Sequence, residues 1–322
     1  NMAINTLEKN SFLKYFEILK DKFFKIMLLN AIYFTVVSIL IFVIMGISSA
    51  VTAIFGDVSD VWTLLTFLPL ILLGPLTAAE MKLMREYVRK EPGFFAQDLK
   101  KAFKDNFKQS IVIALFQYVI IWAIFIAFRF YYAGSGENTF YTIGLGVTIF
   151  VALATIVASY YFYMMTVTLK LTIREIIKNS FIFTMLCIGK NILLTIILAF
   201  WLAFNGILVY LSIISGNALM YGLTICVFMV LTFGIMFYTI AFFTFPSIKQ
   251  YILDPYYEQH PSETSQSVLD KPNAEDINFG AEPKEEDLPE FVYHNGKMVH
   301  RSAFEEEKVF SDERIYKDDD KE

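Results

Sequence analysis

The residues of this sequence that could do catalytic or metal chemistry are few and scattered. The three histidines, His260, His294 and His300, lie near the carboxyl end, and the two cysteines, Cys187 and Cys226, lie inside apolar stretches. His294 and His300 flank an Asn-Gly pair and could face each other across a hairpin, but no cysteine lies near them to complete a zinc site. No glycine-rich loop ends in Gly-Lys-Ser or Gly-Lys-Thr, so no P-loop is present. We therefore predict no metal site, no cofactor and no enzymatic activity.

Polar side chains inside apolar stretches are the remaining candidates for binding chemistry. Such groups either hydrogen-bond neighbouring helices or line a cavity for a solute. The candidates are Asn30, Thr77, Gln117 and Asn205. Trp122 and Trp201 carry rings that can stack on a sugar, although packing against helices or lipid is the simpler interpretation. Glu80 lies at the end of an apolar stretch, where its side chain is expected to reach the membrane surface, so the sequence argues against proton coupling.

These candidates stand on long apolar stretches, which predict an all-α, polytopic membrane protein. Hydrophobic residues make up 56% of the 322 residues, against about 45–50% in soluble domains. Because an α-helix rises about 1.5 Å per residue, about 20 residues cross the hydrocarbon core. Six such spans fit into a membrane domain over residues 26–252, namely Ile26–Ile47, Val61–Ala79, Gln109–Phe128, Phe140–Leu169, Ile192–Ile214 and Leu219–Phe245.

An amphipathic juxtamembrane helix is predicted over residues 1–25. Leu13, Phe16, Leu19 and Phe23 recur at helical spacing, with lysines between them. This helix either lies on the membrane face, with its lysines near anionic headgroups, or simply extends the first span.

The second predicted span contains residues that disfavour a straight helix, namely Pro69, Gly74 and Pro75. Proline removes a backbone donor and clashes with the preceding turn, so we expect a kink or a break there. In lipid the freed carbonyl groups need a partner, and Thr77 is close enough in sequence to provide one.

The basic residues predict which ends of the spans face the cytoplasm. Before the carboxyl-terminal tail there are 19 lysines and arginines, and 18 of them fall on the side that carries both termini, with Arg129 as the exception. The positive-inside rule therefore places both termini in the cytoplasm. The connector between the second and third spans is a basic amphipathic helix, and we expect it to bind anionic lipid headgroups rather than nucleic acid. Its lysines are Lys100, Lys101, Lys104 and Lys108.

A weak internal repeat divides the membrane domain into three. Similar short sequences, Lys20–Phe23, Lys104–Phe107 and Gly189–Asn191, precede the first, third and fifth spans. The chain thus reads as three hairpin-like repeats, each preceded by an amphipathic cytoplasmic connector. Repeats are common in transport folds, and they also arise in any up-and-down helical array.

The carboxyl-terminal tail, residues 253–322, differs in composition from the rest of the chain. From Asp254 onward it holds 20 acidic and 8 basic residues, and residues 254–289 are predicted to be disordered. An Asn-Gly pair between two strand-like runs predicts a hairpin at 291–300. Because an isolated hairpin is marginally stable, we expect it to dock on the inner face of this protein or on a partner protein. The candidate docking residues are Tyr293, Asn295 and Gly296.

Two short motifs carry a resemblance to a known family. Gly74–Ala79 (Gly-Pro-Leu-Thr-Ala-Ala), followed by Phe94 and by Phe103–Ser110 (Phe-Lys-Asp-Asn-Phe-Lys-Gln-Ser), resembles the YesL family of bacterial integral-membrane domains of unknown function. The resemblance covers about residues 10–252. It implies a six-span, multi-pass protein of the bacterial plasma membrane, found mainly in Gram-positive bacteria and often encoded beside genes for carbohydrate ABC transporters and glycan degradation. It supplies no catalytic residues, and the sequence departs from the usual family pattern at Leu76 and Glu80.

Three functions are compatible with these patterns. The first is an accessory, non-catalytic membrane component of carbohydrate uptake or its regulation, with an ABC sugar transporter or another membrane protein as partner. The second is a stand-alone carrier or channel for a small neutral solute, motivated by the kinked second span and the repeat. The third is a membrane scaffold whose acidic tail recruits a soluble protein. Nothing in the sequence specifies an oligomeric state.

Overall fold

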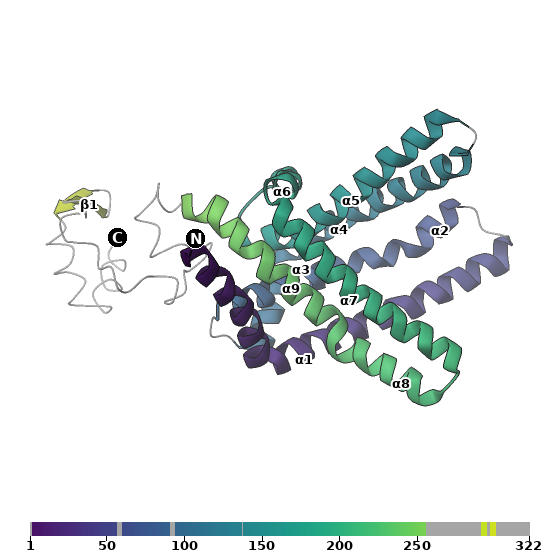
Figure 1. Cartoon of the computed structure of the whole chain (residues 1–322), viewed down its shortest axis with the longest axis horizontal. Helices are drawn as coiled ribbons and strands as arrows, with labels where there is room; N and C mark the ends of the chain where they lie inside the picture. The colour runs from purple at the N-terminus through teal and green to yellow at the C-terminus, as the bar shows by residue number, and fades with distance from the viewer. Residues whose placement is uncertain are drawn as a thin grey trace, which may run out of the picture. The chain divides into compact units, whose positions relative to one another are not determined.

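A computed structural model of the chain describes residues 2–56, 60–90, 94–136 and 138–255, together with strands at 291–294 and 297–300; it describes side chains only from Leu13 to residue 255. The chain divides into two compact units, Asn1–Lys271 and Pro272–Glu322. The first unit is helical (Figure 1). Its elements are α1 (Met2–Phe55), α2 (Asp60–Phe67), η1 (Leu68–Leu72), α3 (Leu73–Val88), α4 (Phe95–Gly134), α5 (Thr139–Thr168), α6 (Ile173–Leu186), α7 (Ile188–Ser215), α8 (Ala218–Val227), η2 (Phe228–Thr232), α9 (Phe233–Ile248) and η3 (Lys249–Leu253).

Six segments of the described chain are long and apolar enough to cross a membrane. They are Leu13–Phe55, Trp62–Val88, Phe95–Gly134, Thr139–Thr168, Ile188–Ser215 and Ala218–Leu253. The predicted all-α, multi-pass class with six spans is therefore confirmed. The helices continue beyond the predicted spans, because charged residues at the ends of an apolar stretch do not stop a helix.

The spans are joined in sequence as three helical hairpins. The hairpins are α1 with α2, α4 with α5, and α7 with α8. In Figure 1 their connecting turns lie at the right of the view, beyond α3 and α9. Two of the turns use glycine with positive φ, namely Gly56 at 74° and Gly216 at 59°, the latter capping α7. Only glycine adopts this left-handed conformation without a steric cost, so the positions of these two glycines determine where the chain turns.

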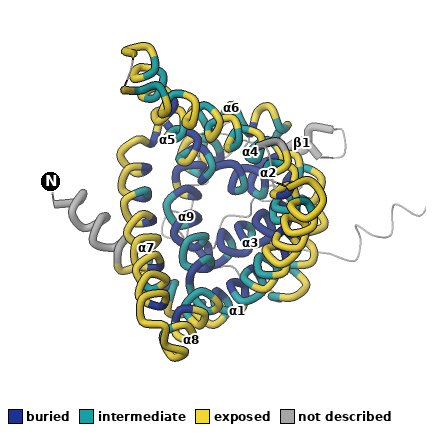
Figure 2. The backbone as a smooth tube through the Cα atoms, turned by 90° about the vertical axis from the view of Figure 1, so that its right-hand side faces the viewer, coloured by how far each residue is buried: buried dark blue, intermediate teal, exposed yellow. Residues whose placement is uncertain are grey.

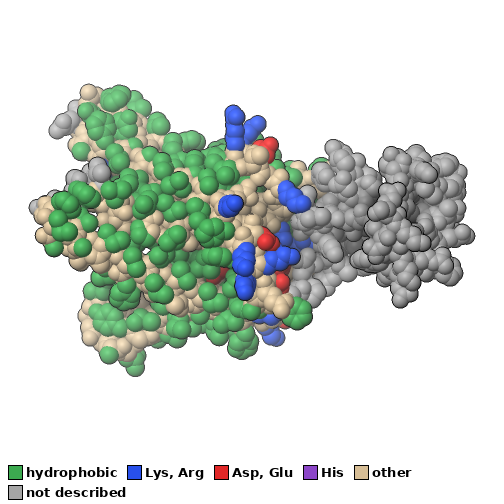
Figure 3. All heavy atoms as spheres, turned by 180° about the vertical axis from the view of Figure 1, so that it is seen from behind, with side chains coloured by type: hydrophobic (Ala, Val, Ile, Leu, Met, Phe, Trp, Pro, Cys, Tyr) green, Lys and Arg blue, Asp and Glu red, His purple; other side chains and the backbone are tan. Residues whose placement is uncertain are grey.

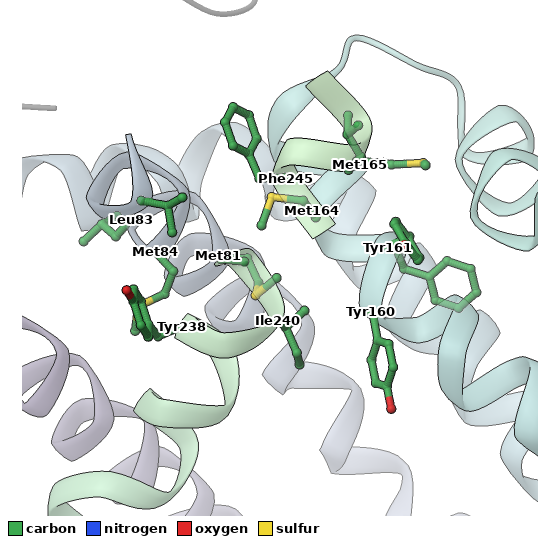
Figure 4. Packing of buried hydrophobic residues seen from close by; sticks show 14 of the residues in the cluster. Met81, Leu83, Met84, Tyr160, Tyr161, Met164, Met165, Tyr238, Ile240 and Phe245 are labelled. Atoms are coloured by element: carbon green, nitrogen blue, oxygen red, sulfur yellow. The ribbon is translucent and has the colours of Figure 1, made fainter. Parts of the chain in front are cut away.

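Two helices lie inside the ring that the other helices of the membrane unit form, namely α3 of the second span and α9 of the sixth (Figure 2). Buried residues make up most of α3, from Gly74 to Val88, and much of α9. Figure 4 shows Met81, Leu83 and Met84 of α3 in one packed region with Tyr238 and Ile240 of α9, and all five belong to a single hydrophobic cluster. The core of the membrane unit is therefore built around these two helices.

The surface of the membrane unit separates an apolar band from a charged end. Figure 3 shows lysine and arginine side chains gathered at one end and hydrophobic side chains over the remainder of the visible face. The lysines of the amphipathic start of α4 are all exposed, namely Lys100, Lys101, Lys104 and Lys108. Phe103 and Phe107 on the same helix are also exposed, at 36% and 39%. This pattern suits a helix at a membrane interface.

The juxtamembrane helix and the first span form one helix, α1. Tyr15 and Ile18 pack inward, where the Tyr15 hydroxyl lies 3.0 Å from Thr239 Oγ1 and Tyr238 donates to the Tyr15 carbonyl at 2.8 Å. Leu13 and Phe16 remain exposed. The structure thus favours the interpretation in which residues before Ile26 extend the first span.

A capping box starts α6 between the fourth and fifth spans. The Glu175 carboxylate accepts from the Thr172 backbone N–H and from the Thr172 hydroxyl, each at 2.8 Å, and the Glu175 N–H donates back to that hydroxyl. Such a box satisfies two backbone donors that the helix leaves open. The hydrogen bonds from Thr172 lower the pKa of Glu175.

This capping box predicts a pH-dependent helix start. Because the pKa of Glu175 is lowered by folding, its contribution is present above the ordinary glutamate pKa and is lost as the pH falls through the folded value. We expect Glu175→Gln to lower the protection factor against amide hydrogen exchange over residues 173–176 at neutral pH by about fivefold, and to make that protection factor insensitive to mild acid. Glu17→Gln, which removes an exposed partner of Lys90, serves as the control. Unchanged exchange in Glu175→Gln would contradict the assignment.

The second unit contains a two-stranded antiparallel sheet where the sequence predicts a hairpin. Strand β1 (Phe291–His294) pairs with β2 (Lys297–His300), with Phe291 opposite His300 and His294 opposite Lys297. Tyr293 lies in β1, whereas Asn295 and Gly296 lie outside the described residues. Residues 256–290, over most of the stretch predicted to be disordered, also lie outside them.

Candidate functional site

The second span is broken where the sequence places its first proline. Between α2 and α3 the chain forms the 3-10 helix η1, with Pro69 in its first turn. Pro75 lies in the first turn of α3, where a missing N–H is tolerated. Tyr118 of α4 donates its hydroxyl to the carbonyl of Leu64, just before the break. The Thr77 hydroxyl donates to the Leu73 carbonyl at 2.9 Å, so Thr77 partners a backbone group at this corner.

A pocket of about 640 Å³ opens beside this break, and we call it the second-span pocket. Its walls come from six elements: α1, the three that make up the second span (α2, η1 and α3), α4 and α5. Its lining includes Tyr33, Thr63, Phe67, Leu70, Gly74, Thr77, Gln117, Tyr118, Trp122 and Tyr163. A volume of this size falls within the range of small-molecule sites, about 300–1,000 Å³.

The polar groups of the second-span pocket divide into paired and unpaired ones. The Tyr33 hydroxyl lies 3.0 Å from Thr77 Oγ1, so these two satisfy each other. The amide of Gln117 and the hydroxyl of Tyr163 have no hydrogen-bond partner among the described residues. This apolar pocket therefore offers a neutral solute two hydrogen-bonding groups and the face of a tryptophan ring.

A second pocket, of about 880 Å³, lies between α1, α7 and α9. Its lining includes Tyr15, Leu19, Ile197, Trp201, Phe204, Thr239 and Phe242. No amide side chain lines it, and Tyr15 and Thr239 are already paired with each other. The second-span pocket is therefore the better candidate for a solute.

Asn30 lies at a helix contact and not in either of these pockets. It is fully buried and donates from Nδ2 to the carbonyls of Phe228 and Met229, at 2.9 and 2.6 Å. Its Oδ1 accepts from the Gly234 N–H at 2.7 Å. The contacted segment, η2, is a π-helix in the sixth span, whose backbone departs from the α-helical hydrogen-bond pattern. Asn30 thus supplies hydrogen bonds to a second break, which the sequence did not signal.

Asn205 supports the same break from the fifth span. Its Oδ1 accepts from the Thr232 hydroxyl at 2.7 Å, and its Nδ2 donates to the Trp201 carbonyl at 2.8 Å. Trp201 donates its indole N–H to the Thr232 carbonyl at 3.1 Å. Of the four polar candidates, Thr77 and Gln117 therefore share the second-span pocket, whereas Asn30 and Asn205 hold helices together.

The expectation that Glu80 reaches the membrane surface is wrong. Its side chain is 0% exposed, because α3 continues to Val88 and is covered by α1, α4, α5 and α9. Neither carboxylate oxygen has a hydrogen-bond partner in the part of the chain that the structure describes. Thr77, which lines the pocket, precedes Glu80 by one helical turn.

The charged end of α3 is anchored by two buried arginines that the sequence analysis did not single out. Arg85 donates from Nη1 to the Val167 carbonyl at 2.8 Å, near the carboxyl end of α5, where a cation is favoured. The Arg89 guanidinium lies 5.8 Å from the centroid of the Phe245 ring on α9. These contacts tie α3 to both α5 and α9.

Three tyrosines of the candidate site, Tyr33, Tyr118 and Tyr163, were also missed from sequence. Tyrosine is common in membrane spans and at their interfaces, and its spacing alone does not say which ring faces a pocket. Within the described residues no group of three or more His, Cys, Asp and Glu could hold a metal ion.

Comparison with known proteins relates one segment of the chain to a described family. The sequence model of a family described as "Protein of unknown function, DUF624" matches residues 51–128, the segment that contributes most of the second-span pocket, together with Glu80. No curated protein and no solved structure matches the chain. Over residues 51–128 the chain is therefore similar to DUF624, a family whose description states no function.

Proposed function

We propose that this chain is a non-catalytic membrane component of carbohydrate uptake in the bacterial plasma membrane, and that it binds a small neutral solute of sugar-like chemistry in the second-span pocket. The observation that carries the proposal is the pair of unpaired polar groups, the Gln117 amide and the Tyr163 hydroxyl, in a pocket lined by Trp122 and Tyr118. The resemblance of Gly74–Ala79 and Phe103–Ser110 to the YesL family supports the connection to carbohydrate uptake. In the leading form of the proposal the chain is an accessory component and acts with a transporter.

This proposal predicts that Gln117→Leu weakens solute binding by about tenfold or more, because the leucine removes both a donor and an acceptor from an apolar pocket. Isothermal titration of the full chain in lipid nanodiscs with a panel of neutral mono- and disaccharides measures the effect. Gln97→Leu, on the exposed start of α4, is the matched control and should bind like the unchanged protein. If no sugar binds, or if both variants bind equally well, the assignment of the pocket fails.

A second candidate function is a stand-alone carrier. It is favoured by the position of the two breaks, η1 and η2, in the second spans of the first and third hairpins. Interrupted helices at corresponding places of a repeated fold are where transporters bind their substrates. Sugar counterflow into proteoliposomes that contain only this chain would establish the carrier. Binding without counterflow, with recovery of a transporter on mild extraction from native membranes, would establish the accessory role.

A further inference from the structure

A buried carboxyl group without a hydrogen-bond partner among the described residues lies inside the membrane unit. Glu80 is 0% exposed, and neither of its carboxylate oxygens is hydrogen-bonded to any residue that the structure describes. Glutamate is almost never fully buried unless it is paired, because the ionised form loses its hydration. A bare carboxylate is therefore incompatible with the packing around Glu80, whereas a neutral carboxylic acid is compatible with it.

Among the described residues, the ion pairs and hydrogen bonds of the membrane unit do not include the Glu80 carboxyl group. Ala79, Met81, Leu83 and Met84 beside it on α3 are buried members of the hydrophobic cluster (Figure 4 shows the last three). The arginines that follow on α3 make other contacts, since Arg85 bonds the Val167 carbonyl and Arg89 lies against the ring of Phe245. A proton is the neutralising ligand that fits a site of this kind.

Polar groups extend from Glu80 in both directions along the contact between α1 and α3. Towards the second-span pocket lie Thr77, about 4.5 Å along the helix axis, and its partner Tyr33 on α1. Towards the charged end lies Tyr87, whose buried hydroxyl also lacks a hydrogen-bond partner and whose ring lies 6.0 Å from the Lys25 ammonium. Tyr33 and Tyr87 both lie within electrostatic range of the Glu80 carboxylate.

The other elements packed against α3 contribute few titratable groups. The groups to consider are Lys25 and Tyr33 on α1, Tyr87 on α3, Asp98 on α4, Tyr163 on α5 and Tyr238 on α9. Tyrosine stays neutral near physiological pH, and the Lys25 ammonium and the Asp98 carboxylate lie near Tyr87, towards the charged end. Glu80 is thus the acid in this set that lies between the charged end and the second-span pocket.

We propose that Glu80 is a proton-binding site, which holds a proton in the packed state seen here and exchanges it with the cytoplasmic end of the bundle along the contact between α1 and α3. The exchange is a simple one, in which a carboxylate and a proton form a carboxylic acid. Intramembrane carboxylic acids of this kind mark proton relays in pumps and transporters. The packing of α3 against α1, α4, α5 and α9 then depends on the protonation of this one side chain, whether or not the second-span pocket binds a solute.

Infrared spectroscopy of the full chain in nanodiscs tests the proposal without any solute. The unchanged protein is expected to show the carbonyl stretching band of a protonated carboxylic acid near neutral pH, and Glu80→Gln is expected to lack that band. The band should shrink reversibly as the pH is raised, and Glu80→Asp should restore a band that titrates. Glutamine keeps the shape of the protonated acid, so a purely structural role predicts no difference between the two proteins in any titration.

Two results would overturn the proposal. The first is a spectrum of Glu80→Gln that equals that of the unchanged protein at every pH, since Glu80 would then be ionised throughout. The second is a band that never responds to pH, since Glu80 would then not exchange its proton. Labelling with a hydrophobic carbodiimide, which reacts with protonated carboxyl groups, gives a second readout. Glu80 should be modified at least about tenfold faster than Glu17, the exposed partner of Lys90, and equal rates would count against the site.

Discussion

Replacing Asn30 with leucine is expected to lower the free energy of unfolding of the membrane unit by about 2–4 kcal/mol. Leucine fills a similar volume but removes the three hydrogen bonds to Phe228, Met229 and Gly234. The two carbonyls and the N–H are then left in an apolar environment, where each unsatisfied group costs about 1–3 kcal/mol. Interhelical hydrogen bonds in membranes are worth less than these values, so the expected loss of about 2–4 kcal/mol lies below the simple sum over the three groups.

Thermal unfolding of the purified protein in nanodiscs, followed by hydrogen exchange over residues 228–234, measures this effect. The exchange should rise at η2 first, because that segment loses its partner. Asn106→Leu is the matched control, since Asn106 donates only to the Ala102 carbonyl of its own helix. If Asn30→Leu and Asn106→Leu unfold alike, Asn30 does not hold the break.

Replacing Gly74 with alanine is expected to destabilise the membrane unit by about 1–3 kcal/mol, the usual cost of overpacking a core. A Cβ atom at this position would lie 2.6 Å from the Ser110 carbonyl oxygen and 2.7 Å from Ala114 Cβ. The α3 and α4 backbones would have to separate, and the second-span pocket between them would change shape. Gly74 and Ser110 come from the two motifs that resemble the YesL family, so this contact brings the motifs together.

The sign of this effect distinguishes it from ordinary helix propensity. Glycine to alanine inside a helix normally stabilises by about 0.5–1 kcal/mol. Gly206→Ala, on α7 with nothing within 4 Å of its added Cβ, should show that gain. Differential scanning of both variants against the unchanged protein is the measurement. A Gly74→Ala protein as stable as Gly206→Ala would contradict the close approach of α3 and α4.

The membrane fold was predictable because a stretch of about 20 residues without a charge is typical of a helix that crosses the lipid bilayer. Six spans follow from the spacing of charged residues, and the break at η1 follows from Pro69. The break at η2 did not follow, because no proline or glycine lies within Phe228–Thr232. The segment is hydrogen-bonded by the side chain of Asn30, about 200 residues away in sequence, and single-sequence patterns do not reveal such a contact.

The candidate site was predictable only in part. Thr77 and Gln117 were found because a polar residue in an apolar stretch is conspicuous, but the same signal also selected Asn30 and Asn205, which hold helices together. Glu80 was misjudged because its distance along the span suggested a surface position. Glu80 is buried by the four helices that cover α3. The sequence of α3 alone does not predict which helices pack against it.

The membrane arrangement and the cytoplasmic proton path proposed for Glu80 both depend on the sidedness of the six spans, and cysteine accessibility in intact cells tests that sidedness most directly. In a background with Cys187→Ala and Cys226→Ala, a single cysteine is placed at Lys101 or at Gly136. Both positions are exposed; Lys101 lies near the start of α4, and Gly136 lies just beyond its end. We predict that a membrane-impermeant maleimide labels Gly136→Cys in intact cells and labels Lys101→Cys only after the cells are permeabilised. Labelling of Lys101→Cys in intact cells, with Gly136→Cys protected, would contradict the arrangement and the cytoplasmic proton path proposed for Glu80.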